Sequence, residues 1–395
     1  MTTSRPIPNR IAAMAPELGE WRRDIHAHPE LGLEEVRTAA LVGEKLREWG
    51  IAVHTGLAKT GVVGTLKVGN GTRAIGLRAD MDALPMQEAN GFAHRSQNPG
   101  AMHACGHDGH TTMLLGAAKY LAETRNFDGT VHFIFQPAEE GLGGGRIMVE
   151  EGLFEKFPCA RVFGAHNDYQ LPLGEMAVAE GAVSAASDRF WITIEGRGGH
   201  AARPHQTVDP VIVGAHMVLA LQTIVSRGID PAESAVLSIT QFHAGSTGNV
   251  IPMEAVLNGT VRTRSPEVQD LVERRMGEIA TQVAATFGAG AKLDYRRGYP
   301  PVINKPAATE AAARAAVQLL GEDRVHRTLP VRMGGEDFSF MAQKVPGCFV
   351  RMGQLGPDGE GGTPVHNPGY DFNDALLPIG VAFWAALVEQ ELKRS

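Results

Sequence analysis

The sequence predicts an α/β protein in which a mostly parallel-sheet domain is interrupted by an inserted α+β domain. Outside residues 184–296, strand-like runs that are apolar almost throughout alternate with helical segments, which is typical of a parallel sheet covered on both faces. Inside residues 184–296, the first strand instead alternates apolar and polar side chains. At roughly 150 residues per domain, a chain of 395 residues has room for two to three domains.

The N-terminal part predicts helices and strands in alternation. Two helices are expected within the first 50 residues, and Gly50 ends the second, which begins at Glu34. The elements expected next are strands at Gly61–Val68, Ala74–Arg78, Thr130–Gln136 and Arg161–His166, and helices at Gly109–Thr124 and Gly144–Glu151. The turn Gly69-Asn70-Gly71 joins the first two of these strands, which favours a hairpin.

Residues 184–296 predict a self-contained domain with the order β-α-β-β-α-β, the ferredoxin-like arrangement. Its expected elements are strands at Asp188–Glu195, Ala235–Phe242, Ala255–Thr263 and Lys292–Arg296, a helix at Val208–Ser226, and a second helix that begins at Pro266. Ser265 caps that second helix. Residues 1–183 and 297–395, which end in an apolar helix at Leu376–Leu392, then form one discontinuous domain.

Composition excludes several classes of protein. With 37 basic and 44 acidic residues the net charge is −7, so we expect no binding to nucleic acid or to an anionic membrane. No stretch approaches the ~20 apolar residues of a membrane-spanning helix. Three scattered cysteines (Cys105, Cys159 and Cys348) are too few for a disulfide framework, which favours the cytoplasm.

The densest group of chemically active residues is the run from His103 to His110, just before an apolar helix. In an extended segment alternate residues share a face, so His103, Cys105 and His107 could point together if this run is extended. Thiolate and imidazole groups are good ligands for zinc-like cations. On this run alone, a buried cysteine with histidines at a helix start is an equally good interpretation.

Three further polar groups follow predicted strands. Glu139 and Glu140 follow one strand, His166 ends another, and Asp80 and Asp82 follow a third. Each alone has an ordinary structural interpretation, such as a solvated loop. In an open α/β sheet, however, ligands bind outside the carboxyl ends of the strands. The convergence of these groups with the His103–His110 run at one sheet edge predicts a metal site.

Two histidines in glycine-rich loops, His366 and His200, are weaker candidates from the residues alone. The whole set of fragments, however, resembles the M20 metallopeptidase family, and within it the aminoacylase-like amidohydrolases that include hippurate hydrolases and auxin-conjugate hydrolases. The fragments, which span Trp21 to Asp374, are RRDIHAHPELGLEE, LRADMDALPM, MHACGHDGHT, FQPAEEGLGG, GAHN, GRGGHAARPH, GNVIP, GGEDFSFM and VHNPGYDFND.

The resemblance implies a site for two divalent metal ions. The residues it assigns as metal ligands are Cys105, His107, Glu140, His166 and His366. Glu139 matches the general base that takes a proton from the attacking water, and Asp82 matches an acidic residue that orients a ligand, although a purely structural role for Asp82 stays open. Zinc, manganese, cobalt and nickel all suit this set of donors.

The resemblance also assigns the inserted domain as a mobile lid and as the contact of a homodimer or homotetramer. His200 matches a histidine that closes over the site and polarises the scissile carbonyl. Asn249, Arg262 and Gly335 match positions near the substrate, although Arg262 is equally suited to a structural salt bridge.

The implied function is metal-dependent hydrolysis of an N-acyl amino acid to a carboxylic acid and a free amino acid. A dipeptidase, a carbamoyl-amino-acid hydrolase and a non-catalytic metal-binding protein are the alternatives. Many members of the family carry Trp-Pro after the histidine and asparagine of the GAHN fragment, whereas this chain has Asp168-Tyr169. We therefore expect the wall of the substrate pocket to differ.

Overall fold

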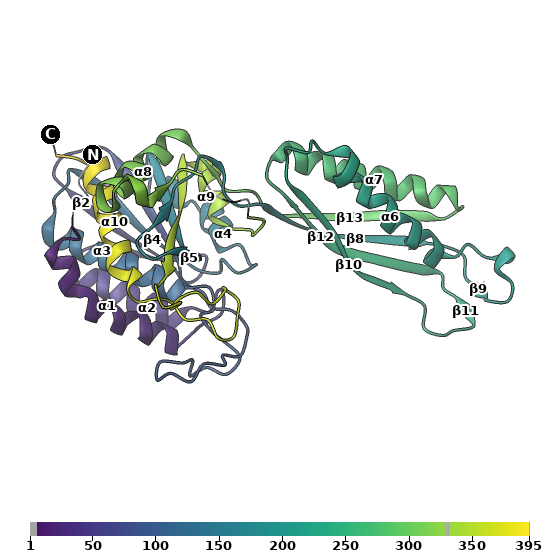
Figure 1. Ribbon diagram of the computed structural model, residues 1–395, viewed down its shortest axis with the longest axis horizontal. Coiled ribbons are helices and arrows are strands. Elements are labelled where there is room, and N and C mark those ends of the chain that lie inside the picture. The colour runs from purple at the N-terminus through teal and green to yellow at the C-terminus, as the bar shows by residue number, and fades with distance from the viewer. Residues whose placement is uncertain (1–5, 329, 331, 395) are drawn as a thin grey trace. The chain divides into compact units, whose positions relative to one another are not determined.

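The computed structural model describes residues 6–328, 330 and 332–394, and the contacts divide the chain into two compact units (Figure 1). The first unit comprises Met1–Val183, Ile303–Pro330 and Asp337–Ser395. The second comprises Ser184–Val302 and Val331–Glu336, so it continues beyond Arg296 and includes a short segment near residue 334.

The first unit is built on an eight-stranded sheet with the order β1-β2-β4-β3-β5-β16-β6-β15. Its strands are β1 (Ala52–Leu57), β2 (Gly61–Val68), β3 (Ala74–Asp80), β4 (Gly129–Gln136), β5 (Arg161–Pro172), β6 (Met176–Ala177), β15 (Val325–His326) and β16 (Gly347–Leu355). The central strands β4, β3, β5 and β16 are parallel. The α/β class and the mostly parallel sheet predicted from the sequence are therefore confirmed.

The predicted hairpin between residues 61–68 and 74–78 is wrong. Strand β2 pairs antiparallel with β1, which the sequence analysis missed, and with β4, which lies between β2 and β3. The turn at Gly69 signals only a reversal of the chain. Because β3 is buried on both faces, it is more stable in the centre of the sheet, with parallel partners on both sides.

Helices cover the sheet of the first unit. They are α1 (Asn9–Ala27), α2 (Val36–Glu48), α3 (His107–Thr124), α4 (Gly144–Glu150), α5 (Leu153–Lys156), α8 (Pro306–Leu320), α9 (Phe338–Lys344) and α10 (Leu376–Glu391). Helices α1, α3 and α10 pack on one another, and α10 also contacts α8. Helix α4 packs against α9 (Figure 1).

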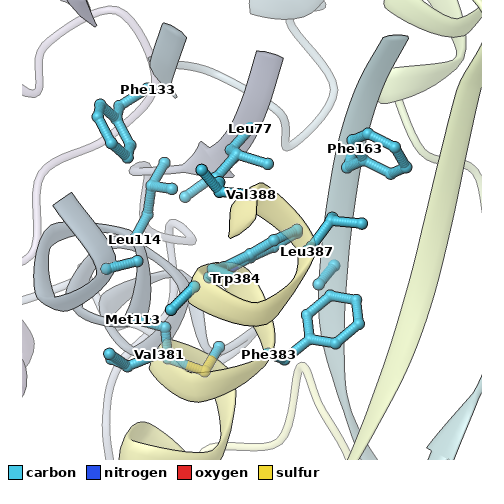
Figure 2. Packing of buried hydrophobic residues seen from close by; sticks show 14 of the residues in the cluster. Leu77, Met113, Leu114, Phe133, Phe163, Val381, Phe383, Trp384, Leu387 and Val388 are labelled. Carbon is cyan, nitrogen blue, oxygen red and sulfur yellow. The ribbon is translucent and has the colours of Figure 1, made fainter. Parts of the chain in front are cut away.

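The main core lies between the sheet and helices α3 and α10 (Figure 2). Leu77 of β3, Phe133 of β4 and Phe163 of β5 are fully buried in one cluster with Leu114 and Trp384. Burial of each such side chain contributes roughly 1.5–3 kcal/mol. This packing fixes three parallel strands side by side, so their carboxyl ends are held at one edge of the sheet.

The second unit has a four-stranded antiparallel sheet with the order β10-β12-β8-β13. Its elements are β8 (Ala186–Glu195), α6 (Pro210–Gly228), β10 (Ala235–Ala244), β12 (Glu254–Thr263), α7 (Pro266–Thr286) and β13 (Gly290–Tyr299). This chain order and strand order make the ferredoxin-like arrangement. As predicted, the Ser265 hydroxyl caps α7, accepting a hydrogen bond from the backbone N–H of Val268 at 3.3 Å.

Helix α6 is long and apolar enough to cross a membrane by length and composition alone, although the sequence analysis expected no such stretch. That signal is weak, because a core helix of a soluble protein passes the same test. One side of α6 buries Val213, Met217 and Leu221 in the core of the second unit. The other side leaves Ile212 and Leu219 exposed.

Candidate metal centre and active site

The candidate site lies at the carboxyl ends of β3 and β4 and beside the middle of β5, where β5 extends beyond its pairing with β3. Asp80, the last residue of β3, pairs with Gln136, the last residue of β4. On the other side of β3, Arg78 pairs with Gly164 of β5, two residues before His166. The polar groups that follow these strands therefore lie at one edge of the sheet, as predicted.

Cys105 and His107 approach His166 through a tight turn. The Cys105 Sγ lies 3.3 Å from the His166 Nε2. Gly106, between the two ligand candidates, has a φ of +92°, and a Cβ there would lie 2.4 Å from the Asn167 side-chain oxygen. Only glycine fits such a turn. Cys105, His107 and His166 thus offer three donor atoms within 4.8 Å of one another, and all three residues are buried.

Both buried histidines present the same nitrogen to this group. The His107 Nδ1 lies 2.8 Å from the Asp82 carbonyl oxygen and 3.2 Å from its Oδ1, and the His166 Nδ1 lies 2.7 Å from the Asn167 carbonyl oxygen. Because these oxygens only accept hydrogen bonds, each Nδ1 carries the proton. In the neutral imidazole each Nε2 then has a lone pair, as a metal ligand requires.

Glu140 and His366 complete the group. The His366 Nε2 lies 3.1 Å from the Glu140 Oε1, and these two residues and Cys105 form a second set of donors within 4.8 Å. The backbone N–H of His366 donates to the Ala104 carbonyl at 2.7 Å, which holds the glycine-rich loop against the Cys105 turn. The structure therefore brings together all five predicted ligands.

Glu139 lies beside these donors and is also buried. It forms a third close set with His107 and Glu140. The preceding residue, Ala138, has a φ of +56° and donates its N–H to Glu35 at 2.8 Å. Burial raises the pKa of the Glu35 carboxyl. This left-handed turn directs two consecutive glutamates to one place.

Asp82 links the two halves of the group. In addition to its contact with His107, its Oδ2 accepts the backbone N–H of Glu140 at 2.9 Å. One carboxylate thus orients an imidazole and fixes the turn that carries the glutamates. This geometry is that of a residue that orients a ligand.

The pKa directions fit a site made for cations. Burial, together with the nearby Glu140 carboxylate, raises the pKa of the Cys105 thiol, and a bound cation would reverse this by stabilising the thiolate. Burial lowers the pKa of His166, which keeps that imidazole neutral. Burial alone would lower the pKa of His107, but the buried Asp80 carboxylate outweighs it and raises that pKa, and a bound cation would take the place of the proton on the Nε2.

Two buried atoms test whether metal ions fit. The His107 Nε2 and the Glu140 Oε1 have almost no exposed surface and make no hydrogen bond of good geometry, although the Glu140 Oε1 lies in the ion pair with His366. Buried polar atoms are rarely unpaired, and both atoms point into the cluster of donors. The overlapping sets of sulfur, nitrogen and oxygen donors accommodate two divalent cations side by side.

Comparison with models of protein families identifies the family to which the chain belongs. The model of peptidase family M20/M25/M40 matches residues 76–390, which is most of the sequence. The chain belongs to peptidase family M20/M25/M40. The resemblance stated from the sequence fragments is confirmed.

Individual M20 proteins are similar over almost the whole chain. A hippurate hydrolase from Campylobacter jejuni is 42% identical over 383 residues, covering 95% of this chain and 97% of that one. An IAA-amino acid hydrolase from Arabidopsis thaliana is 40% identical over 390 residues, covering 96% and 87%. The crystal structure of a dinuclear metal-binding peptidase of the M20 family from Bacillus subtilis is 35% identical, with a TM-score of 0.86 and coverage of 97% and 99%.

One part of the sequence argument does not hold for this M20 site. His103 was expected to point with Cys105 and His107, but it belongs to none of the donor sets found among the described residues. The left-handed turn at Gly106 and the start of α3 at His107 break the extended geometry on which the alternation depends. Both ring nitrogens of His103 are buried without a hydrogen bond, and burial lowers its pKa to about 4.

A series of hydrogen-bonded residues that supports the ligand candidates was not predicted from the sequence. The Asp80 Oδ1 lies 2.6 Å from the His110 Nδ1, and the His110 Nε2 lies 2.8 Å from the Asn167 side-chain oxygen. These contacts connect the ends of β3 and β5 through α3. Asp80 lies in a fragment already noted for its acidic strand end, so the signal was present but could not be separated from that of Asp82.

The remaining predicted site residues lie in the second unit. His200, on the short strand β9 (Gly199–His200), pairs with Val250 of β11 (Val250–Ile251) and is exposed. The Asn249 carbonyl accepts the N–H of Ala201 at 3.0 Å, so the structure brings His200 and Asn249 together within this unit.

Arg262 and Gly335 lie elsewhere in the second unit. Arg262, on β12, is half-buried and pairs with Ser187. A Cβ on Gly335 would lie 3.0 Å from the side chain of that same serine. The approach of these residues and of His200 and Asn249 to the ligand candidates stays a prediction.

Proposed function

We propose that this M20 chain hydrolyses the amide bond of N-acyl amino acids, releasing a carboxylic acid and a free amino acid. The observation that carries the proposal is the position of Glu139, a buried carboxylate directly beside the five ligand candidates. A protein that only bound metal would not need a further carboxylate there. Hippurate and IAA-amino acid conjugates, named for two similar proteins, are both N-acyl amino acids.

In this proposal the metal ligands are Cys105, His107, Glu140, His166 and His366. The cations they hold, which the chemistry of the donors allows to be zinc, manganese, cobalt or nickel, supply Lewis acidity and lower the pKa of water when bound. Asp82 keeps the His107 imidazole oriented.

Glu139 moves the proton. Its carboxylate takes a proton from the attacking water and then gives it to the amide nitrogen, which leaves as the amine of the amino acid. Burial beside the ligand candidates suits this task because a carboxylate there is not solvated as it is in bulk water.

We also propose that the second unit closes over the substrate. His200 would polarise the scissile carbonyl, with Asn249, Arg262 and Gly335 contacting or shaping the substrate site. Exposure of His200 on a short two-stranded ribbon supports a mobile donor. We expect His200→Ala to lower kcat by about 10²-fold while the metal content stays that of the wild type, because an electrophilic donor is lost. An unimpaired variant would contradict this role.

A homodimer or homotetramer formed through the second unit is part of the proposal. Strand β10 is an edge of its sheet, and large apolar side chains are exposed on it and on the neighbouring helix α6. These side chains are Val211, Ile212, Leu219, Val236 and Phe242. Exposed edges and apolar patches favour pairing with a second copy. We further propose a cytoplasmic location, with which three unpaired thiols are consistent.

A substrate panel tests the reaction. Purified enzyme is supplied with hippurate, N-acetyl amino acids, dipeptides and N-carbamoyl amino acids, and the released amino acid is measured with and without added manganese, zinc or cobalt. We expect metal-dependent release from N-acyl amino acids. Turnover confined to dipeptides or carbamoyl compounds would replace the substrate class, and no turnover at all would favour a binding protein.

A further inference from the structure

A fully buried guanidinium lies beneath the candidate site. The Arg78 side chain, from β3, donates to the Gln136 Oε1 at 2.8 Å, to the Asp80 Oδ2 at 2.7 Å and to the Asp337 Oδ1 at 2.9 Å. All four side chains are buried. A buried arginine needs anionic partners, and Asp80 and Asp337 supply them.

The Asp337 carboxylate accepts hydrogen bonds from three residues that are distant in the sequence. Besides Arg78, its carboxylate accepts the Gln136 Nε2–H at 2.7 and 2.9 Å and the backbone N–H of Gly145 at 2.8 Å. Asp337 immediately precedes α9, yet its side chain makes no hydrogen bond that caps this helix. Helix capping therefore does not explain the residue.

The partners of Asp337 enclose the turn that carries the proposed base. Gln136 ends the strand before Glu139, and Gly145 lies in the first turn of the helix after it. The backbone N–H of Asp337 itself donates to the Glu139 Oε1 at 3.4 Å. At 3.4 Å this hydrogen bond is long, although it directs the N–H at one oxygen of the carboxylate. One residue thus fixes both ends of the turn and contacts its reactive carboxylate.

We propose that Asp337 is a positioning residue for Glu139, through a clamp formed with Arg78 and Gln136. The clamp holds the Asp337 backbone N–H against one carboxylate oxygen and thereby sets the direction of the carboxylate. This inference rests on the proposed role of Glu139 as the base. The same arginine also holds Asp80, which contacts His110, so the clamp ties the base to the structure around the ligands.

Asp337→Asn tests the clamp because both carboxylate oxygens of Asp337 accept hydrogen bonds. The asparagine side chain keeps one accepting oxygen and has an amide nitrogen, which cannot accept, in place of the other. We expect kcat on the best N-acyl substrate to fall at least about tenfold, with KM and bound metal within about twofold of the wild type. Circular dichroism and the Tm show whether the variant is folded. If it is not, Gln136→Met, which removes the side-chain nitrogen that donates to both carboxylate oxygens of Asp337, is expected to give a smaller loss of the same kind.

A double-mutant cycle with Glu139→Gln separates positioning from general damage. If Asp337 acts through Glu139, adding Asp337→Asn to Glu139→Gln lowers kcat by no more than about twofold further. The matched control is Glu391→Gln, which removes a buried carboxylate paired with Arg161 and Arg73 at the opposite ends of the strands. We expect its kcat to stay within about twofold of the wild type.

The outcomes are distinct. An active Glu139→Gln enzyme would overturn the proposed base and, with it, this inference. An inactive Glu139→Gln enzyme with a normal Asp337→Asn enzyme would overturn the clamp alone. A full tenfold loss from Asp337→Asn in both backgrounds would also overturn it, because the residue would then act independently of Glu139.

Discussion

Two neighbouring glutamates have different surroundings at the residue scale. Glu140 lies against His366 and Cys105, whereas Glu139 receives the N–H of Asp337. Adjacent buried carboxylates repel each other unless a cation or a proton intervenes. The positive φ of Ala138 turns the chain so that both carboxylates lie in the same place. Their repulsion is relieved only when a cation or a proton lies between them.

The division of labour predicts opposite phenotypes for neighbouring positions. Glu139→Gln should lower kcat by about 10²-fold or more and keep the metal content of the wild type, because a general base is removed and no ligand is lost. Cys105→Ala and His166→Ala should lose bound metal, measured by atomic emission of dialysed protein. Near-normal turnover of Glu139→Gln would exclude it as the base.

The sequence could predict the ligand candidates but not what supports them. Cys105 precedes α3, Glu140 follows β4 and His166 lies on β5, and the order of these elements was predictable. Parallel strands bring their carboxyl ends together. The contact between Arg78 and Asp337 joins residues 259 positions apart, and no local pattern announces it. Such pairings depend on how whole elements pack.

At the scale of elements, a buried histidine joins α1 to the start of α3. The His26 Nδ1 lies 2.8 Å from the Asp108 Oδ2, and its Nε2 lies 3.3 Å from the Glu88 Oε1. Burial alone would lower the pKa of His26, but these two carboxylates raise it to about 9. The pair therefore holds the helix that begins at His107 as long as His26 is charged.

His26→Gln should show a pH-dependent loss of stability. Since the folded-state pKa of about 9 lies above the ordinary value of 6.5, the stabilisation is complete below pH 6.5 and disappears as the pH rises through 9. We expect the variant to lose about 3 kcal/mol of unfolding free energy at pH 6 and progressively less above pH 9. Denaturant titrations across this range measure it, and a constant difference would contradict it.

The element order was more predictable than strand pairing. The ferredoxin-like order followed from alternation and from the Ser265–Pro266 helix start, because these are local signals. The placement of β4 between β2 and β3 was not predictable in the same way. A turn such as that at Gly69 shows that the chain reverses, but it does not show which strand pairs with β2. Competition among distant strands is decided by burial of both faces of β3.

At the scale of the whole molecule, the proposed contact between copies of the chain can be tested with a surface substitution that leaves the core of each unit unchanged. Leu219, 70% exposed on α6, is expected to lie in the contact between copies. Leu219→Arg should shift the enzyme toward monomers in light scattering, because a charge would be buried at the interface. Val36→Arg, at a position 68% exposed in the first unit, is the matched control and should leave the mass unchanged. A Leu219→Arg enzyme with the wild-type mass would exclude this surface.

The central claim is that metal ions held at the sheet edge make this chain an N-acyl amino acid hydrolase. Its most direct test is a metal titration of chelator-stripped enzyme, with bound metal and hippurate hydrolysis measured on the same samples. We expect no turnover by the stripped enzyme and recovery in step with the loading of two divalent cations per chain. Equal turnover before and after stripping, or full loading with no release of glycine or of any other amino acid from its N-acyl form, would contradict it.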